Sequence, residues 1–337
     1  MDLTTTYLGL TLRNPVVASA SPMTQDVDGV RRLVDAGVSA VVLPSLFEEQ
    51  VRREEVSDTM LQEVHEGSFG EARNYFPDSP TTSLGGVRAH LSLVERAVQA
   101  SEVPVIASLN GSSRGGWTEI ATALAGAGAA AIELNIYAVP GDTYTSGAEV
   151  EKRHLDIVAS VCSAVSVPVS VKLSPFFSAT GALAQAIVNA GAQGLVLFNR
   201  FVQPDIDPVR IAVVPNVHLS SRTESRVPMT WIAILRNQIR TSFAGTTGVE
   251  EPEDVAAYLL AGADVVMTAS ALLRHGPQHA THLVTGLEGW LAEHGYDSVN
   301  AVKGLLSVGR HQDAEGYERT GYVAALRKAR QTYGSLT

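Results

Sequence analysis

A chain of 337 residues with a formal net charge of −10 is poorly suited to a polyanionic partner, so the sequence predicts no nucleic-acid binding. Its single cysteine, Cys162, excludes an intrachain disulfide and is typical of a reducing cytoplasm. No apolar run approaches the roughly 20 residues of a membrane span, and the chain does not open with a basic region followed by an apolar one. We therefore expect a cytoplasmic protein with no membrane partner.

Short apolar runs recur along the chain, and each is interpreted as a buried strand. The eight runs are residues 16–20, 40–45, 104–109, 131–135, 168–173, 194–199, 243–248 and 264–269. Helical patterns separate most of them, for instance residues 117–127, 181–190, 252–261 and 271–294. Strand–helix units repeated in this way predict an α/β fold, a (β/α)₈ TIM barrel over residues 1–295.

A doubly wound sheet is the alternative that also uses strand–helix repeats. Such a sheet is expected to carry a Gly-x-Gly-x-x-Gly turn after its first strand. The chain reads Ala18-Ser19-Ala20-Ser21-Pro22 at this place, so the barrel is favoured.

Additions to the barrel are expected at four places. Residues 3–14 alternate apolar and polar side chains, which predicts an N-terminal β-hairpin that caps the bottom of the barrel. Residues 211–229 read as an insertion before strand seven, and residues 296–337 as a C-terminal helical tail packed on the barrel. The long polar stretch 48–84 is typical of a lid or wall of a functional site.

Lys172 stands at the exit of the fifth predicted strand. The chain has only four lysines, and a charged amine inside a buried strand is costly unless an anionic or electron-rich group meets it. The plain alternative is an ammonium that reaches out of the strand end into solvent. We interpret Lys172 as a cation held at the barrel mouth, where barrel enzymes carry their active sites.

The other strand ends carry small hydroxyl and amide groups. They include Ala18-Ser19, Ser45, Asn135, Asn199, Thr247-Gly248 and Ala269-Ser270. Glu133 alone cannot support chemistry that needs two carboxylates. Because no metal-ligand set is evident in the sequence, we expect no metal.

The loops after the last two predicted strands indicate a phosphate site. Gly245-Thr246-Thr247-Gly248 and Thr268-Ala269-Ser270 each lead into a helix, and helix N-termini with small residues favour anions. Two ordinary helix starts with hydroxyl N-caps are the alternative. A phosphate there, with Lys172 and Asn135 at the middle of the mouth, indicates a phosphorylated cofactor or substrate.

Taken in order, these segments resemble the dihydroorotate dehydrogenase family of flavin-dependent (β/α)₈ barrels. The stretch from Asn14 to Ala20 is similar to the family's opening strand, and Glu133-Leu134-Asn135-Ile136 to the start of its Glu-Leu-Asn-Leu-Ser-Cys-Pro-Asn run. Val171-Lys172-Leu173-Ser174-Pro175 is similar to Val-Lys-Leu-x-Pro. Gly245-Thr246-Thr247-Gly248 resembles Gly-Thr-Gly-Gly, and Ala269-Ser270-Ala271-Leu272 resembles the segment at the FMN phosphate.

The resemblance implies an FMN-dependent oxidoreductase of the soluble class. It would oxidise dihydroorotate to orotate, in pyrimidine biosynthesis, or a related small ring, by hydride transfer to flavin. Lys172 would stabilise the reduced flavin, and Asn135 and Asn199 would orient the ring edge or substrate. The implied FMN-binding residues are Ala18, Ser19, Ser45, Asn135, Lys172, Asn199, Ser221, Thr247, Gly248, Ala269 and Ser270. A homodimer and an electron-transfer partner subunit follow from family analogy alone.

The catalytic loop departs from the family pattern. The family's base, a cysteine or serine, aligns with Ala138, and its lysine after the second strand aligns with Pro44. Dehydrogenation needs a base near the carbon that loses a proton. Tyr137 is therefore a catalytic candidate beside Lys172 and Asn135, with Tyr144 and Ser146 as alternatives, although each also suits a structural role.

Three interpretations stay open from the sequence. The first is oxidation of dihydroorotate or a related ring, and the second is a flavin-binding barrel that has lost this chemistry. The third is a flavin-free phosphate-binding barrel, an isomerase or aldolase, in which Lys172 forms a Schiff base with a carbonyl substrate. We favour the two flavin-binding interpretations over the third.

Overall fold

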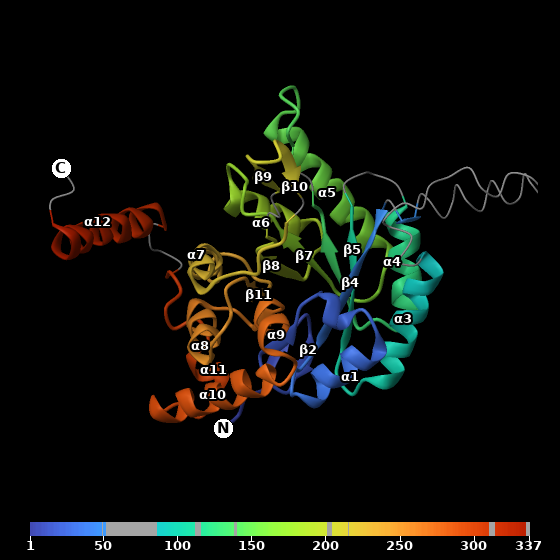
Figure 1. Ribbon diagram of the computed structural model, residues 1–337, viewed down its shortest axis with the longest axis horizontal. Coiled ribbons are helices and arrows are strands. Elements are labelled where there is room, and N and C mark those ends of the chain that lie inside the picture. Colours follow the sequence, from blue (N-terminus) through green and yellow to red (C-terminus); the bar gives the residue numbers. More distant parts are fainter. Residues whose placement is uncertain are drawn as a thin grey trace, which may run out of the picture.

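The computed structural model describes residues 1–48, 50–51, 86–111, 116–137, 140–200, 204–214, 216–309 and 314–334. Eight parallel strands close into a barrel in the order β11-β12-β3-β4-β5-β6-β7-β8 (Figure 1). They are β3 (Val16–Ala18), β4 (Val41–Phe47), β5 (Val105–Asn110), β6 (Ala131–Asn135), β7 (Val169–Leu173), β8 (Gly194–Leu197), β11 (Ser242–Thr246) and β12 (Val265–Thr268). All eight predicted strands are confirmed.

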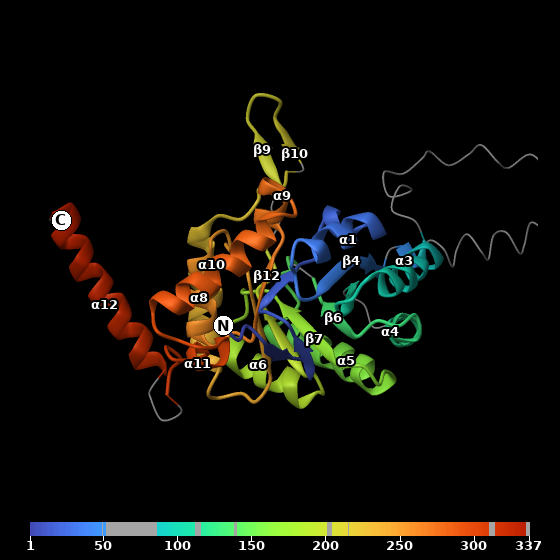
Figure 2. The ribbon, with the colours of Figure 1, turned by 90° about the horizontal axis from the view of Figure 1, so that it is seen from below.

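Helices surround the barrel (Figures 1 and 2). They are α1 (Val27–Asp35), α3 (Val87–Ala100), α4 (Trp117–Gly126), α5 (Gly147–Ala164), α6 (Thr180–Asn189), α7 (Arg226–Leu235), α8 (Pro252–Ala261), α9 (Ser270–His275) and α10 (His279–Glu293). The single helix expected over residues 271–294 is divided into α9 and α10. Gly276 there has a φ of 86° and Pro277 follows, and neither continues a helix. The prediction of a (β/α)₈ TIM barrel is confirmed.

An N-terminal hairpin closes the bottom of the barrel. Strand β1 (Thr5–Tyr7) pairs with β2 (Leu10–Leu12) through a turn whose two central residues have φ angles of 53° and 77°. Tyr7, Leu8 and Leu12 are buried against the apolar interior of the barrel strands. The expected bottom cap is therefore present.

One buried carboxylate ties the elements at the bottom together. Asp264 Oδ2 accepts hydrogen bonds from Arg236 Nη1 and from the Phe243 N–H, each at 2.8 Å. Its Oδ1 lies 3.1 Å from Lys303 Nζ, which also donates to Thr5 Oγ1 at 2.9 Å. This cluster links the hairpin, two barrel strands, α7 and the segment after α10.

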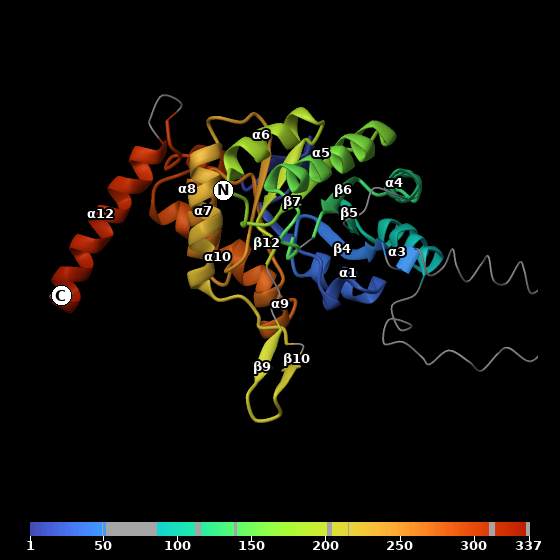
Figure 3. The same cartoon turned by 90° about the horizontal axis from the view of Figure 1, so that it is seen from above.

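The insertion before the seventh barrel strand includes a hairpin that stands out from the molecule. Strands β9 (Asp205–Asp207) and β10 (Ala212–Val214) pair with each other and with no barrel strand (Figures 2 and 3). The chain then passes through the short helix η3 (Arg222–Ser225) into α7. An insertion before the seventh barrel strand is confirmed, but its bounds differ from the predicted 211–229, because its hairpin already begins with β9 and residues 226–229 belong to α7.

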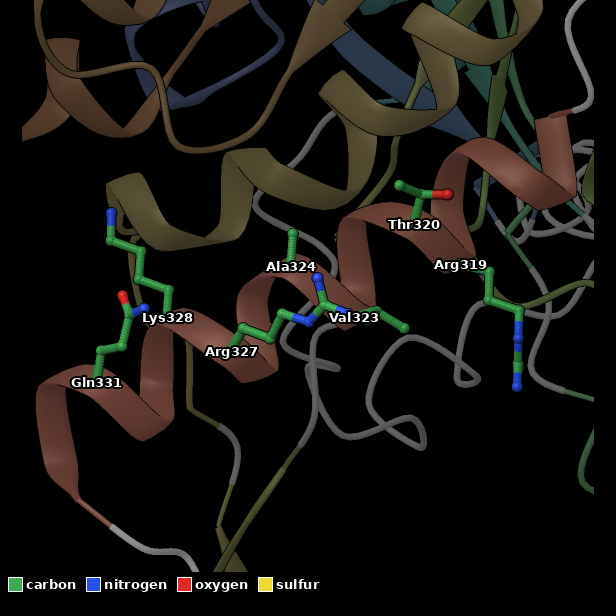
Figure 4. Close-up of a pocket in the computed structure, with 7 residues that line it drawn as sticks. All are labelled: Arg319, Thr320, Val323, Ala324, Arg327, Lys328 and Gln331. Atoms are coloured by element: carbon green, nitrogen blue, oxygen red, sulfur yellow. The ribbon is translucent and has the colours of Figure 1, made fainter.

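The expected C-terminal tail divides into two parts. Val299 and Val302 of α11 (Val299–Val302) are buried, whereas α12 (Ala314–Tyr333) exposes its apolar Tyr322 and Leu326. Helix α12 stands away from the barrel (Figures 1 and 3), so the expected packing on the barrel does not extend to it. Figure 4 shows a hollow along α12 that is lined by this helix alone, mainly by polar and basic side chains. The domain boundary at residue 295 stays a prediction.

Candidate functional site

A cavity of about 220 Å³ opens at the carboxyl-terminal ends of the barrel strands. Residues that follow β3, β8, β11 and β12 line it, together with the end of β7 and the insertion. Among its described lining residues, Lys172 and Arg200 are the ionisable side chains, and both are cations. Each pairs with a carboxylate that lies outside the lining, Glu133 and Glu224 respectively. The charged groups that face the cavity itself are positive, which favours an anionic ligand.

Seven of the sequence-predicted binding residues line this cavity. They are Ser19, Lys172, Asn199, Thr247, Gly248, Ala269 and Ser270. They come from five different strand ends, and closure of the barrel brings them together.

Four other predicted residues lie outside the cavity lining. Ala18 is fully buried in β3, and the Ser45 hydroxyl bonds that of Ser108 at 2.7 Å. Asn135 lies behind the lining, where its Oδ1 accepts a hydrogen bond of 2.9 Å from Asn199 Nδ2. Ser221 caps the N-terminus of η3, and its N–H donates to Glu224 Oε2. Ala18, Ser45 and Ser221 thus have packing or structural contacts, and Asn135 contacts Asn199, which lines the cavity.

Lys172 forms the floor of the cavity at its β7 side. Its side chain is only 11% exposed, and Nζ lies 3.4 Å from Glu133 Oε1 on β6. The ammonium therefore does not reach out into solvent. Its partner is Glu133, to which the sequence alone gives no catalytic role. The Glu133 side chain is 2% exposed, so both members of the ion pair are buried.

The loop after β11 meets the insertion and the loop after β12. Thr247 and Gly248 have consecutive left-handed φ angles of 82° and 73°, which turn the backbone back toward the insertion. The Gly248 N–H donates to Ser220 Oγ at 3.2 Å, and that hydroxyl lies 2.9 Å from Ser270 Oγ. Sequence reasoning chose Ser221 and missed Ser220, because the pattern of two adjacent serines does not tell which one faces inward.

Only one of the two predicted helix N-termini faces the cavity. At the start of α8, Asp254 Oδ2 accepts hydrogen bonds from the N–H groups of Glu250 and Glu251, at 3.1 and 2.9 Å. The Glu251 side chain in turn accepts from the Asp254 N–H, so this terminus is closed by its own two acids in a capping box. Ala269 and Ser270 at the start of α9 do line the cavity.

Arg200 is a cavity residue that sequence reasoning missed. Its guanidinium pairs with Glu224 at 3.1 Å and donates to the His218 carbonyl oxygen. These contacts connect the insertion, through His218 and Glu224, to the chain that follows β8. Its position directly after a predicted strand-end residue was the available signal.

The base candidates that the sequence suggests are not among the described residues that line the cavity. Tyr144 is 93% exposed, and Ser146 caps α5 by accepting the Glu149 N–H at 3.3 Å. Tyr137 does not line the cavity, and Ala138 lies outside the described residues. Nearly all of the predicted lid, residues 48–84, also lies outside them.

The residues that the structure describes contain no group of His, Cys, Asp or Glu side chains arranged to hold a metal ion. Within the described ranges no helix combines the length and apolarity that crossing a membrane requires. Burial raises the pKa of the Cys162 thiol to about 11, so this cysteine is a weak nucleophile near neutral pH.

Comparison with known families identifies the family to which this barrel belongs. The family model for dihydroorotate dehydrogenase matches residues 82–291. The chain belongs to this family. The match includes most of the strands that build the cavity floor and the terminal loops, so the dihydroorotate dehydrogenase-like motifs lie where the cavity is.

Three relatives illustrate the range of the family. The catalytic subunit of dihydroorotate dehydrogenase B (NAD(+)) from Methanothermobacter thermautotrophicus is 27% identical, over 90% of this chain and 98% of the relative. The putative dihydroorotate dehydrogenase A (fumarate) from Aeropyrum pernix is 28% identical, over 65% of this chain and 72% of the relative. The PreA subunit of NAD-dependent dihydropyrimidine dehydrogenase from Escherichia coli is 24% identical, over 91% and 77%.

Proposed function

We propose that this dihydroorotate dehydrogenase family member binds FMN across the barrel mouth and oxidises a CH–CH bond of a small anionic ring, with dihydroorotate as the first candidate. The observation that carries the proposal is the cavity whose described ionisable lining is purely cationic, with Lys172 as its floor. When bound, the flavin supplies the hydride acceptor for the reaction.

The donor set of the cavity fits FMN at both ends. Lys172 and Asn199 would meet the ring, and the hydroxyls and amides of Thr247, Gly248 and Ser270 would meet the phosphate. In the structure Gly248 and Ser270 both bond to Ser220. A hydroxyl both donates and accepts, so these groups can exchange a mutual hydrogen bond for one to a phosphate oxygen.

The chain's own residues then have defined tasks. The Lys172 ammonium favours negative charge at the ring edge, because preorganised charge in a water-poor site acts strongly. The hydrogen bond between Asn199 and Asn135 fixes the orientation of both amides. Phe198 and Met267 line the cavity and exclude water. Tyr137 as the base stays a prediction.

The second candidate is a flavin-binding barrel that has lost dihydroorotate chemistry. The observation in its favour is that no carboxylate, histidine, cysteine or tyrosine lines the cavity among the described residues. Schiff-base chemistry is less well supported, because it needs a neutral amine and Lys172 faces a buried carboxylate at 3.4 Å.

Anaerobic reduction of the flavin-loaded protein tests the substrate. We expect addition of dihydroorotate to bleach the visible flavin bands, and addition of orotate, which has no hydride to give, to leave them unchanged. Bleaching by dihydrouracil but not by dihydroorotate would move the substrate to the neutral dihydropyrimidines. Bands that dithionite bleaches but neither ring does would support the second candidate.

The assembly of the protein with a partner subunit is also a proposal. Two of the three relatives carry names of subunits, which supports an electron-transfer partner subunit for this chain as well. The homodimer and the cytoplasmic location stay predictions.

A further inference from the structure

A row of polar side chains crosses four neighbouring strands inside the barrel, just below the cavity floor. The strand register pairs Ser45 with Ser108, Ser108 with Glu133, and Glu133 with Ser170. The last three side chains are buried. Because side chains alternate along a strand, Lys172 points to the same side of β7 as Ser170, one level nearer the mouth.

Glu133 is the acid in this row, and one of its two carboxylate oxygens makes no hydrogen bond to a described residue. Oε1 faces Lys172, but among the described residues Oε2 has no hydrogen-bond partner. Burial, with a further contribution from the charge of Glu133, raises the pKa of Tyr7. The charge of Glu133 is thus spread over few hydrogen bonds, and Lys172 is the cation that balances it.

We propose that Glu133 is a positioning residue for the redox site, which holds the Lys172 ammonium at the cavity floor and sets how much of its positive charge reaches the cofactor. This inference rests on the proposed function, in which FMN lies against Lys172. With the carboxylate in place, the cofactor faces an ion pair. Without it, the cofactor faces an uncompensated cation.

Stability alone does not account for a glutamate at this level. Barrel interiors are filled mainly by branched aliphatic side chains, and a buried ion pair is often no more stabilising than apolar residues of similar size. Charge interactions in a poorly solvated interior remain strong over several ångström. A carboxylate one level below the cavity therefore acts mainly through the electrostatics of Lys172.

The variant Glu133→Gln keeps the size of the side chain and removes its charge. In FMN-loaded protein at about pH 6, where an ordinary amine is fully protonated, the ammonium would be uncompensated and negative charge on the cofactor favoured. We expect the equilibrium constant for two-electron reduction, measured against a reference dye, to rise at least about tenfold, which corresponds to about 30 mV. An unchanged or lower potential would overturn the proposal.

Ser108→Ala is the matched control, because Ser108 lies in the same buried row but bonds Ser45 at 2.7 Å. Its potential should equal that of the unaltered protein, and a shift as large as that of Glu133→Gln would overturn the proposal. Should glutamine at position 133 prevent folding, Glu133→Asp keeps the charge but withdraws it by one methylene group. It should then shift the potential in the same direction by less, and no shift would count against the proposal.

A measurement without flavin separates this inference from the proposed function. Acetic anhydride modifies neutral amines, and the extent at Lys172 can be followed by mass spectrometry in flavin-free protein. Glu133 Oε1 holds Nζ at 3.4 Å, so loss of this ion pair in Glu133→Gln should leave the amine freer to react and raise the initial rate at least about threefold. Ser108→Ala should leave the rate unchanged. Equal rates in all three proteins would overturn the ion pair. A raised rate in a protein that takes up no FMN would keep the pair but overturn the redox role together with the proposed function.

Discussion

Lys172 occupies the second-last position of β7, and its side chain is 11% exposed beside a carboxylate on the neighbouring strand. The sequence shows a lysine in a buried strand, and elementary electrostatics then demands a partner. The sequence does not show which residue is the partner. Glu133 lies 39 residues earlier, and the register between β6 and β7 cannot be predicted from the residue pattern of either strand. Local sequence is enough to predict that Lys172 is a cation with a partner. The identification of Glu133 as that partner requires the structure of the closed barrel.

A double-variant cycle tests this pair through stability. Lys172→Met leaves the buried Glu133 carboxylate without its cation, and breaking a buried pair from one side costs about 3–5 kcal/mol. We expect a loss of about 3 kcal/mol in the free energy of unfolding of flavin-free protein, with much of it recovered in Lys172→Met/Glu133→Gln. Urea unfolding of the two single variants, the double variant and the parent measures the cycle. Losses that simply add would contradict the pairing.

His90 in α3 gives a pH dependence whose sign is fixed. Burial lowers the pKa of His90 from 6.5 to about 4, so between these values the unfolded chain binds a proton that the folded protein does not. His90 therefore does not lower the free energy of unfolding above about pH 6.5, and it lowers this free energy progressively as the pH drops toward 4. One pKa unit corresponds to about 1.4 kcal/mol, so the loss is about 3 kcal/mol. Urea midpoints at pH 7 and 4.5 should converge in His90→Leu, and identical pH profiles in both proteins would contradict the prediction.

At the scale of elements, the site depends on how the two terminal loops meet the insertion. The sequence predicts both loops, because small residues before a helix are a local signal. It does not predict that Ser220 reaches both Gly248 and Ser270. These contacts join residues about 30 to 50 positions apart, and only the barrel closure sets their distances.

Gly248 carries the geometry of this junction. Its φ is 73°, and a Cβ built there would lie 2.7 Å from the Ser221 carbonyl oxygen and 2.8 Å from the Ser225 nitrogen. Gly295 has the same φ with nothing within 4 Å of a Cβ, so alanine at either position costs about 1 kcal/mol of backbone strain. Only Gly248→Ala should weaken FMN binding, by at least about tenfold or 1.4 kcal/mol, in a fluorescence titration. Equal affinities in the two variants would show that this loop does not contact the cofactor.

At the scale of the molecule, the barrel was readable because strand–helix repeats are strong local patterns. The position of α12 could not be predicted, because its residues indicate a helix but not the surface on which that helix packs. The bottom of the barrel is a similar case. Asp264 is one acid at the start of a strand in the sequence, yet in the structure it joins Arg236, Lys303 and the N-terminal hairpin through Thr5.

Asp264 should therefore matter more to stability than an exposed acid does. Asp264→Asn leaves two cations without their shared, 8% exposed carboxylate, and we expect the free energy of unfolding to fall by about 3 kcal/mol. Asp28→Asn is the control, because Asp28 is 87% exposed beside Arg31 and such surface pairs contribute less than about 1 kcal/mol. Urea unfolding measures both, and similar losses would contradict the role of the Asp264 cluster.

The central claim is that a flavin lies across the mouth of this barrel against Lys172. The visible absorption spectrum of the purified protein, recorded after incubation with FMN and removal of unbound FMN by gel filtration, tests it most directly. We predict the two absorption bands of a protein-bound flavin. A colourless protein that retains no FMN would contradict the account and move the assignment of Lys172 to carbonyl chemistry.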